Sequence, residues 1–222
     1  MEAHADPRSE DPRSLLDGED VDVGGACGQT TTRLLEGLKD SGNQTSWRAL
    51  DQRMRPILLR FFRGCRMEES EAVDLAQITL ADVFHAYRDG QYVRAKGRLS
   101  GWILGFARNR LRKHRAERAN QREVPLESQH LDSDEECALE ERWRADCRRE
   151  IMARAIDLLR QQGGVSETTF TAFARTCLEG ASTGAVAEEL GLSENAVYIA
   201  KHRCLKSLRK LAGELSARYE LD

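Results

Sequence analysis

Apolar residues recur at spacings of three and four along most of the chain from Trp47 onward. This spacing places them on one face of an α-helix, so the pattern predicts a chain built from amphipathic helices. A chain of 222 residues is long enough for one or two domains with hydrophobic cores. We therefore expect an all-α fold, with two helical domains joined by a flexible linker.

Two stretches interrupt the helical pattern and divide the chain. Residues 1–45 are rich in Gly and acids, and their apolar periodicity is poor before Leu34, which predicts a flexible acidic arm with room for one short helix. Residues 119–134 combine Pro125 with serines and a run of acids, as is typical of a linker. The predicted units are a helical bundle over 46–118 and a C-terminal domain over 135–218.

Start and stop signals define the first helices of the bundle. Ser46 is the expected N-cap of the first of them, and Pro56 should kink it. A second helix over about 69–88 should bury one apolar stripe, formed by Val73, Ala76, Leu80, Val83, Phe84 and Tyr87. Its polar face presents acids and an amide rather than cations, at Asp74, Gln77 and Asp82.

Positive charge is concentrated in one segment of a chain whose net charge is -3. Between Arg94 and Arg122 the only acid is Glu117, and the cations are Arg94, Lys96, Arg98, Arg108, Arg110, Arg112, Lys113, Arg115, Arg118 and Arg122. Such a block attracts a polyanion, because neutralised phosphates release their counterions. A solvated helix face is the plainer interpretation of a charge run, but aromatic residues lie among these cations: Tyr92, Trp102 and Phe106.

Aromatic rings supply stacking surfaces for unpaired bases, which lysines alone do not. The segment therefore indicates binding of nucleic acid by a basic loop and the helix that follows it, from about Leu99 to Glu117. Trp102 lies on the apolar face of that helix, so its spacing is at least as consistent with a core position as with base contact.

The C-terminal segment predicts a helix-turn-helix. A short helix over 183–190 is followed by the turn Gly191-Leu192-Ser193, with Ser193 as N-cap of a helix reaching about Leu215. The outer face of that second helix has side chains suited to reading the major groove near its start and phosphates farther on. Its members are Asn195, Tyr198, Ile199, His202, Lys206 and Arg209. A generic helical hairpin with a solvated face is the alternative.

Several classes of function find no support in the sequence. The six cysteines form no CxxC pair and no zinc-ligand spacing with His, so we expect no metal and no cofactor, and a redox role for Cys137 and Cys147 is only weakly indicated. The N-terminus is no secretion signal, and no apolar run reaches membrane-spanning length. These features predict a cytoplasmic protein without membrane insertion.

Three blocks together resemble the extracytoplasmic-function subfamily of bacterial RNA polymerase sigma factors. They are DLAQITLADVF (74–84), LSGWILGFARNRLRKHR (99–115) and LEGASTGAVAEELGLSENAVYIAKHRCLKSLRKL (178–211), in the family's order and spacing. The resemblance covers roughly residues 46–118 and 135–215. It implies a transcription initiation factor with no active site of its own, which binds core RNA polymerase and promoter DNA. Members of the family are commonly held inactive by an anti-sigma factor, which is a further candidate partner.

The resemblance also assigns roles to residues of this chain. It implies that Asp74, Gln77 and Asp82 bind the clamp helices of the polymerase. It implies contacts to the opened minus-ten element by Tyr92, Arg94, Lys96, Arg98, Trp102, Asn109, Arg112 and Lys113. It implies contacts to the minus-thirty-five element by Ser193, Asn195, Tyr198, Ile199, His202, Arg203 and Lys206.

Two alternatives stay open at this point. One is a classical repressor or activator that uses the C-terminal helix-turn-helix on duplex DNA and needs no polymerase. The other is an enzyme, such as a small recombinase or nuclease with a helix-turn-helix tail. The enzyme is the weaker alternative, because no HxxxH motif, paired acidic motif or Gly-rich phosphate loop stands out.

Overall fold

The computed structural model describes residues 31–40, 42–121, 133–161 and 164–219, and this part of the chain contains helices and turns without a strand. The prediction of an all-α fold is confirmed. The helices are α1 (Thr31–Lys39), α2 (Gln44–Gly64), α3 (Glu69–Arg88), α4 (Leu99–Gln121), α5 (Ser133–Gln161), α6 (Glu167–Phe173), α7 (Thr183–Leu190) and α8 (Glu194–Tyr219).

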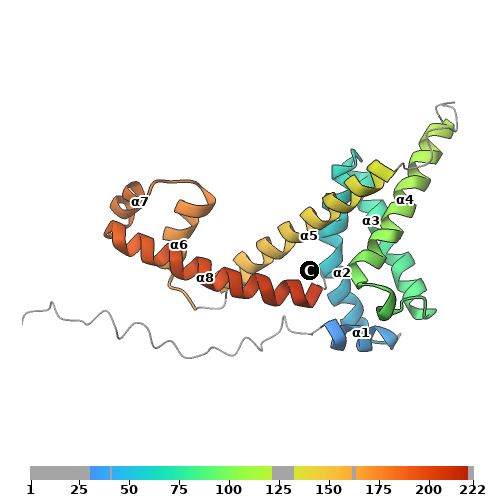
Figure 1. The fold of residues 1–222 in the computed structure, drawn as a ribbon, viewed down its shortest axis with the longest axis horizontal. Helices are drawn as coiled ribbons and strands as arrows, with labels where there is room; N and C mark the ends of the chain where they lie inside the picture. The colour runs from blue at the N-terminus through green and yellow to red at the C-terminus, as the bar shows by residue number, and fades with distance from the viewer. Residues whose placement is uncertain (1–30, 41, 122–132, 162–163, 220–222) are drawn as a thin grey trace, which may run out of the picture.

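The larger hydrophobic core lies at one end of the molecule, where α1, α3 and α4 pack around α2 (Figure 1). Ile57, Leu58, Phe61 and Phe62 of α2 are fully buried there, because α3, α4 and α5 cover different sides of this helix. α1 contributes buried leucines to the same core, at Leu34, Leu35 and Leu38. Residues 31–39 form the short helix for which the predicted arm left room, but they pack into the core instead of belonging to a flexible arm; residues 1–30 lie outside the described residues.

Local signals at the start of α2 differ from the expectation. The N-cap is Asn43, whose side-chain oxygen accepts a hydrogen bond of 3.1 Å from the backbone amide of Ser46. Ser46 is thus a buried residue in the first turn and not the predicted cap. Asn and Ser cap equally well, so the sequence alone favoured the one closer to the apolar pattern. α2 continues past Pro56 to Gly64 as a single helix.

The buried face of α3 is rotated from the predicted stripe. Its buried members are Ala72, Leu75, Ala76, Thr79, Val83, Ala86 and Tyr87. Val73, predicted to be buried, is 38% exposed, and Ile78 is 41% exposed. Ala72 and Thr79 take the inner positions because small side chains allow the helices to approach closely, which hydrophobicity alone does not reveal.

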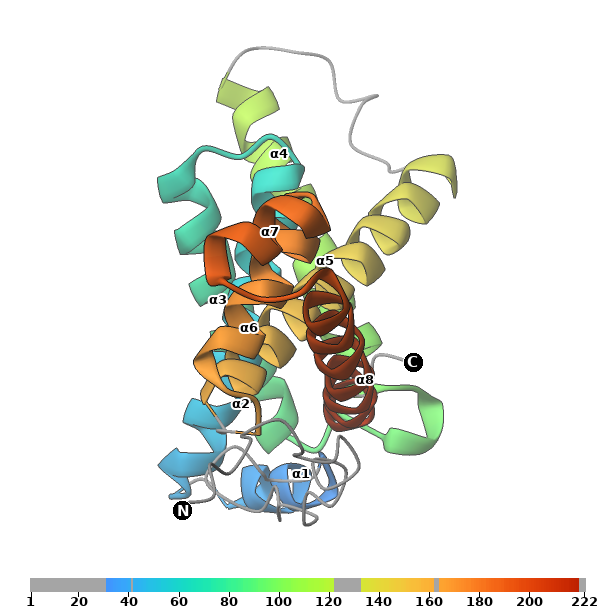
Figure 2. The ribbon, with the colours of Figure 1, turned by 90° about the vertical axis from the view of Figure 1, so that its left-hand side faces the viewer.

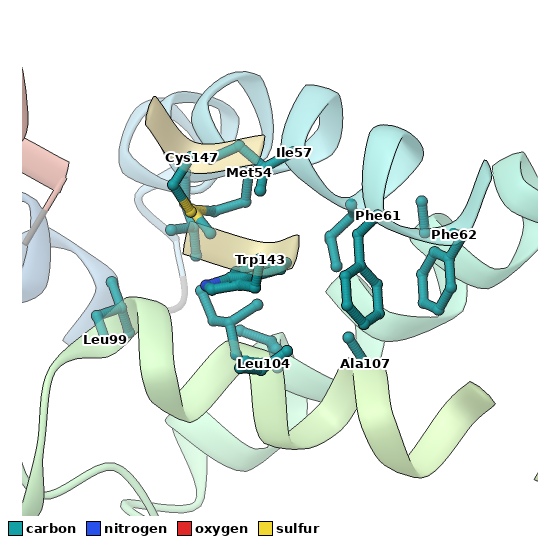
Figure 3. Packing of buried hydrophobic residues seen from close by; sticks show 14 of the residues in the cluster. Met54, Ile57, Phe61, Phe62, Leu99, Leu104, Ala107, Trp143 and Cys147 are labelled. Atoms are coloured by element: carbon teal, nitrogen blue, oxygen red, sulfur yellow. The ribbon is translucent and has the colours of Figure 1, made fainter. Parts of the chain in front are cut away.

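α5 contributes to two cores along its 29 residues. Its first half places Leu139, Trp143 and Cys147 in the larger core, where Trp143 lies beside Leu104 (Figure 3) and its ring centroid is 5.6 Å from that of Phe61. Its second half packs against α6 and α8. The packing therefore divides the chain within α5, near residue 150, and not at the predicted start of the C-terminal domain. α4 and α5 also extend into the predicted linker, of which residues 122–132 lie outside the described part.

The C-terminal helices form two smaller cores that meet along α8. One joins α5, α6 and α8, and the other joins Ala172 of α6 with α7 and the start of α8. Ser166 caps α6, and its hydroxyl accepts a hydrogen bond of 3.2 Å from the amide of Thr169. The far end of α8 returns to α1 and α2 (Figure 1), and the turned view shows α8 nearly end-on (Figure 2). There the guanidinium of Arg53 lies over the ring of Tyr219 at 5.6 Å.

Candidate functional site

The loop between α3 and α4 exposes three cations on a short framework. A 3-10 turn spans Arg94–Lys96, and the side chains of Arg94, Lys96 and Arg98 are exposed. The hydroxyl of Tyr92 donates to the carbonyl of Gly97 at 3.3 Å, which ties the two ends of the loop together. An open hollow of about 530 Å³ lies between this loop and the last turns of α8. The loop thus places three exposed cations beside an open hollow.

A ladder of aromatic rings supports this loop. Tyr87 stacks on Tyr92 with centroids 5.8 Å apart, Tyr92 lies 5.2 Å from Trp102, and Trp102 meets Phe106 edge-on at 5.0 Å. Tyr92 and Trp102 are both partly exposed and pack against the larger core. Trp102 therefore supports the loop by packing against Tyr92. Part of the Trp102 ring and part of the Tyr92 ring remain exposed and accessible for stacking.

The exposed face of α4 carries Asn109, Arg112 and Lys113, while Arg108 is half-buried beside them. Arg112 lies 3.8 Å from Glu136, and Arg108 lies 3.6 Å from Glu140, so these cations face acids of α5. Lys113 lies 4.0 Å from Glu117 on its own helix. The predicted minus-ten residues of α4 are brought together on one face, but they share it with carboxylates that the sequence did not place there.

α3 presents a second exposed surface, of mixed character. Asp74 and Gln77 are exposed as predicted, and they stand between the exposed apolar side chains of Val73 and Ile78. Asp82 differs, because both of its carboxylate oxygens accept hydrogen bonds from Arg110 of α4. The hydrogen bond to Asp82 raises the pKa of the Arg110 guanidinium. The structure thus keeps Asp74 and Gln77 available and uses Asp82 to join α3 to α4.

The segment from α7 to α8 has the predicted short helix, Gly turn and capped longer helix. Gly191 ends α7 with φ of 64°, a left-handed conformation that glycine adopts without strain. The hydroxyl of Ser193 then accepts from the amide of Ala196 at 3.2 Å. Ser193 therefore caps α8. Its hydroxyl, which was predicted to contact DNA, already accepts this hydrogen bond.

The outer face of α8 is open along its first three turns. Tyr198 is 64% exposed and Ile199 is 57% exposed, which is unusual for side chains of this size. The remaining predicted members are exposed as well: Asn195, His202, Arg203 and Lys206. The inner face is fixed by small buried residues, Val197 and Ala200, against Val186 and Ala187 of α7.

Two features that hold this unit together were missed in the sequence. Ser182 caps α7 by accepting from the amide of Ala185 at 3.2 Å, and a serine directly before a helix is a common capping signal. Arg175, near the start of a π-helical turn (Ala174–Leu178), pairs with both Glu179 and Glu189 and thereby links this turn to α7. No residue pattern in the sequence predicted the π-helical turn.

The cysteines of the described part are free thiols. Burial raises the pKa of the Cys147 thiol to about 12 and that of Cys204 to about 11, so both stay protonated and unreactive at neutral pH. Cys137 is exposed and lies on α5, the same helix as Cys147. Within the described ranges, no group of three or more His, Cys, Asp or Glu residues is placed to hold a metal ion.

None of the helices in the described part combines the length and the apolar character needed to cross a membrane. In comparisons with known proteins, no protein-family model matches the chain and no curated protein matches it significantly.

Proposed function

We propose that the chain is a transcription initiation factor of the extracytoplasmic-function sigma type, acting in the cytoplasm as a specificity subunit of RNA polymerase. The observation that carries this proposal is the presence of two differently built cationic surfaces. The basic loop stands on aromatic rings, which suits unpaired bases, whereas the outer face of α8 is an open helix surface, which suits a duplex groove. A factor that opens a promoter needs both.

In this proposal the loop and α4 hold the opened minus-ten element. Extracting a base from the stack costs a few kcal/mol, which contacts to the base and to the backbone must offset. Tyr92 and Trp102 offer ring surface at the loop, and Arg94, Lys96 and Arg98 offer charge around it. Asn109, Arg112 and Lys113 continue the path of the strand along α4.

The outer face of α8 reads the minus-thirty-five element as a duplex. Asn195, Tyr198 and Ile199 lie near its N-terminal end, where side chains of a recognition helix reach base edges. His202, Arg203 and Lys206 follow and supply contacts to the phosphate backbone. The exposed face of α3 around Asp74 and Gln77 is left to bind core polymerase.

Dependence on core polymerase distinguishes the proposed sigma factor from the alternative, a classical repressor or activator. A repressor binds its duplex site tightly alone, whereas a sigma factor forms its stable promoter complex with core enzyme. We expect a gel shift of a cognate promoter fragment when core enzyme and the chain are both present. A tight shift by the chain alone, unchanged by core enzyme, contradicts the proposal.

Replacing Arg112 and Lys113 by Ala should weaken promoter complexes and flatten their dependence on salt. Each lost contact to a single-strand phosphate lowers the slope of log K against log salt by about 0.7. The matched control replaces Lys39 and Arg148, two exposed cations outside the proposed surface. A slope unchanged from the wild type, or equally reduced in the control, shows that α4 does not follow the backbone.

Replacing Tyr198 by Ala should change which upstream elements are preferred. A good base contact discriminates by about 1–3 kcal/mol, so the loss should be about 5- to 150-fold on the best site and small on poor sites. Lys206→Ala is the matched comparison, because loss of a phosphate contact weakens all sites alike. Binding of a randomised minus-thirty-five library by the holoenzyme measures both, and a uniform loss for Tyr198→Ala contradicts base reading.

A further inference from the structure

The cationic face of α4 is matched by a row of acids on the first turns of α5. Arg108 lies 3.6 Å from Glu140 and donates to the carbonyl of Glu136 at 3.2 Å. Arg112 lies 3.8 Å from the carboxylate of Glu136, one helical turn farther on. Arg115 forms an ion pair with Glu135, completing a series in which the two helices run past each other in opposite directions.

These ion pairs are at the surface, while α5 is anchored by other contacts. In this part of α5 the apolar residues Leu139 and Trp143 are buried in the larger core, and Trp143 meets Phe61 of α2. Arg112 and Glu136 remain 42% and 47% exposed. Exposed ion pairs contribute little to stability, so α5 is held by its apolar side while its acidic side only occupies the cations of α4.

One of these cations, Arg112, is among those that the proposed function gives to the promoter strand, and Arg108 and Arg115 flank it on the same helix. A single strand offers them phosphates, and carboxylates held one helical turn apart offer them a comparable row of negative charge. Binding of the strand then exchanges one set of anions for another, and fewer counterions are released than from bare cations. Exchange is feasible because the Arg112–Glu136 and Arg115–Glu135 pairs are exposed to solvent, where ion pairs contribute little, whereas Arg108 is more deeply held.

We propose that the first turns of α5, through Glu135, Glu136 and Glu140, act as an internal competitor that occupies the strand-binding face of α4 until nucleic acid displaces them. This inference rests on the proposed function, because it takes α4 to be the strand-binding face. It makes the free chain a weak binder of single strands. It also gives the segment that follows the α4–α5 connection a role in preventing unproductive binding.

The test compares charge-matched variants of the full chain in binding a short, fluorescently labelled single-stranded DNA across a series of salt concentrations. The competitor variant is Glu135→Gln/Glu136→Gln/Glu140→Gln. The control, Glu141→Gln/Asp157→Asn/Glu214→Gln, removes the same net charge from positions outside the row. We expect the competitor variant to bind about tenfold tighter, with a slope steeper by about 0.7 for each cation released. Affinity and slope equal to those of the control overturn the inference.

Removing Arg112 and Lys113 separates this inference from the proposed function. In the competitor background, Arg112→Ala/Lys113→Ala should reduce the gain, because Arg112 is one of the three cations that the substituted acids contact. If the competitor variant equals its control but Arg112→Ala/Lys113→Ala still weakens the wild type, the internal competitor is excluded and the strand-binding face stands. If Arg112→Ala/Lys113→Ala changes nothing in either background, the proposed role of α4 is excluded and the inference falls with it.

A measurement on the wild-type chain removes any dependence on how the variants fold. Amide hydrogen exchange over residues 133–141 should become faster when the single strand is added, because the ion pairs to α4 are what hold the turn of α5 that precedes the buried Leu139. Exchange over 151–159, in the other core, should stay the same. Unchanged or slower exchange over 133–141 in the presence of bound strand contradicts the inference.

Discussion

Asp74→Arg should lower the proposed affinity of the chain for core RNA polymerase by about 100-fold, since like charges brought together at an interface cost several kcal/mol. Asp74 is exposed on α3, and Val73 and Ile78 beside it are apolar side chains of 38% and 41% exposure. An acidic residue between exposed apolar ones suits a partner surface that is basic and partly apolar. Reversing its charge turns an attraction into a repulsion at the same place.

This substitution should leave the fold unchanged, because exposed sites away from caps and cores usually alter stability by less than about 0.5 kcal/mol. The matched control is Asp157→Arg, an equal charge reversal on the exposed side of α5. Titration of labelled core enzyme measures both affinities, and thermal unfolding checks the fold. Equal affinities for the two variants contradict the assignment of α3 as the polymerase-binding helix.

Trp143→Ala is expected to destabilise the chain by about 3–5 kcal/mol, the usual loss for a large aromatic side chain removed from a core. Trp143 is 3% exposed, lies 5.6 Å from Phe61 between ring centroids, and sits beside Leu104 (Figure 3). The indole therefore fills space between α2, α4 and α5, and its removal leaves a cavity there.

Urea denaturation followed by circular dichroism measures this loss. Met152→Ala is the matched control, since Met152 is 46% exposed on the same helix and should cost less than about 1 kcal/mol. A loss below about 1 kcal/mol for Trp143→Ala means that the first half of α5 does not belong to the larger core. That result would also remove the anchor on which the internal competitor depends.

The helices were predictable because their apolar spacing is a local property of the sequence. The turn at Gly191 and the caps at Ser166 and Ser193 were equally readable, since each depends on a residue and the few that follow it. The cap at Asn43 was misplaced by three residues because two good capping residues stand close together. Boundaries of helices are sensitive to such local competition.

The packing of one helix against another was harder to predict from the sequence. α5 is periodic along its whole length, so nothing in the pattern tells that Trp143 and Leu158 belong to different cores. Val73 and Ala72 are neighbours on the helix, and hydrophobicity favoured the larger side chain although Ala72 is the buried one. The face of a helix that is buried depends on the shape of its partner, which the sequence of one helix does not contain.

For the candidate site, the sequence located the surfaces but not their ion pairs. The exposed positions on α8 and the cationic loop lie where the residue pattern predicted them. The pairing of Arg110 with Asp82 and of Arg112 with Glu136 joins residues that are far apart in the chain. Each such pair depends on where two helices cross, so opposite charges in the sequence could not reveal it.

Run-off transcription with purified components tests the central claim most directly. Core RNA polymerase is supplied with fragmented genomic DNA of the source cell, with and without the chain, and the transcript starts are sequenced. The account predicts a set of new starts that appears only with the chain, shares upstream elements at fixed spacing and is lost with Asp74→Arg. Starts that are the same with and without the chain, under conditions where core enzyme is active with another initiation factor, contradict it.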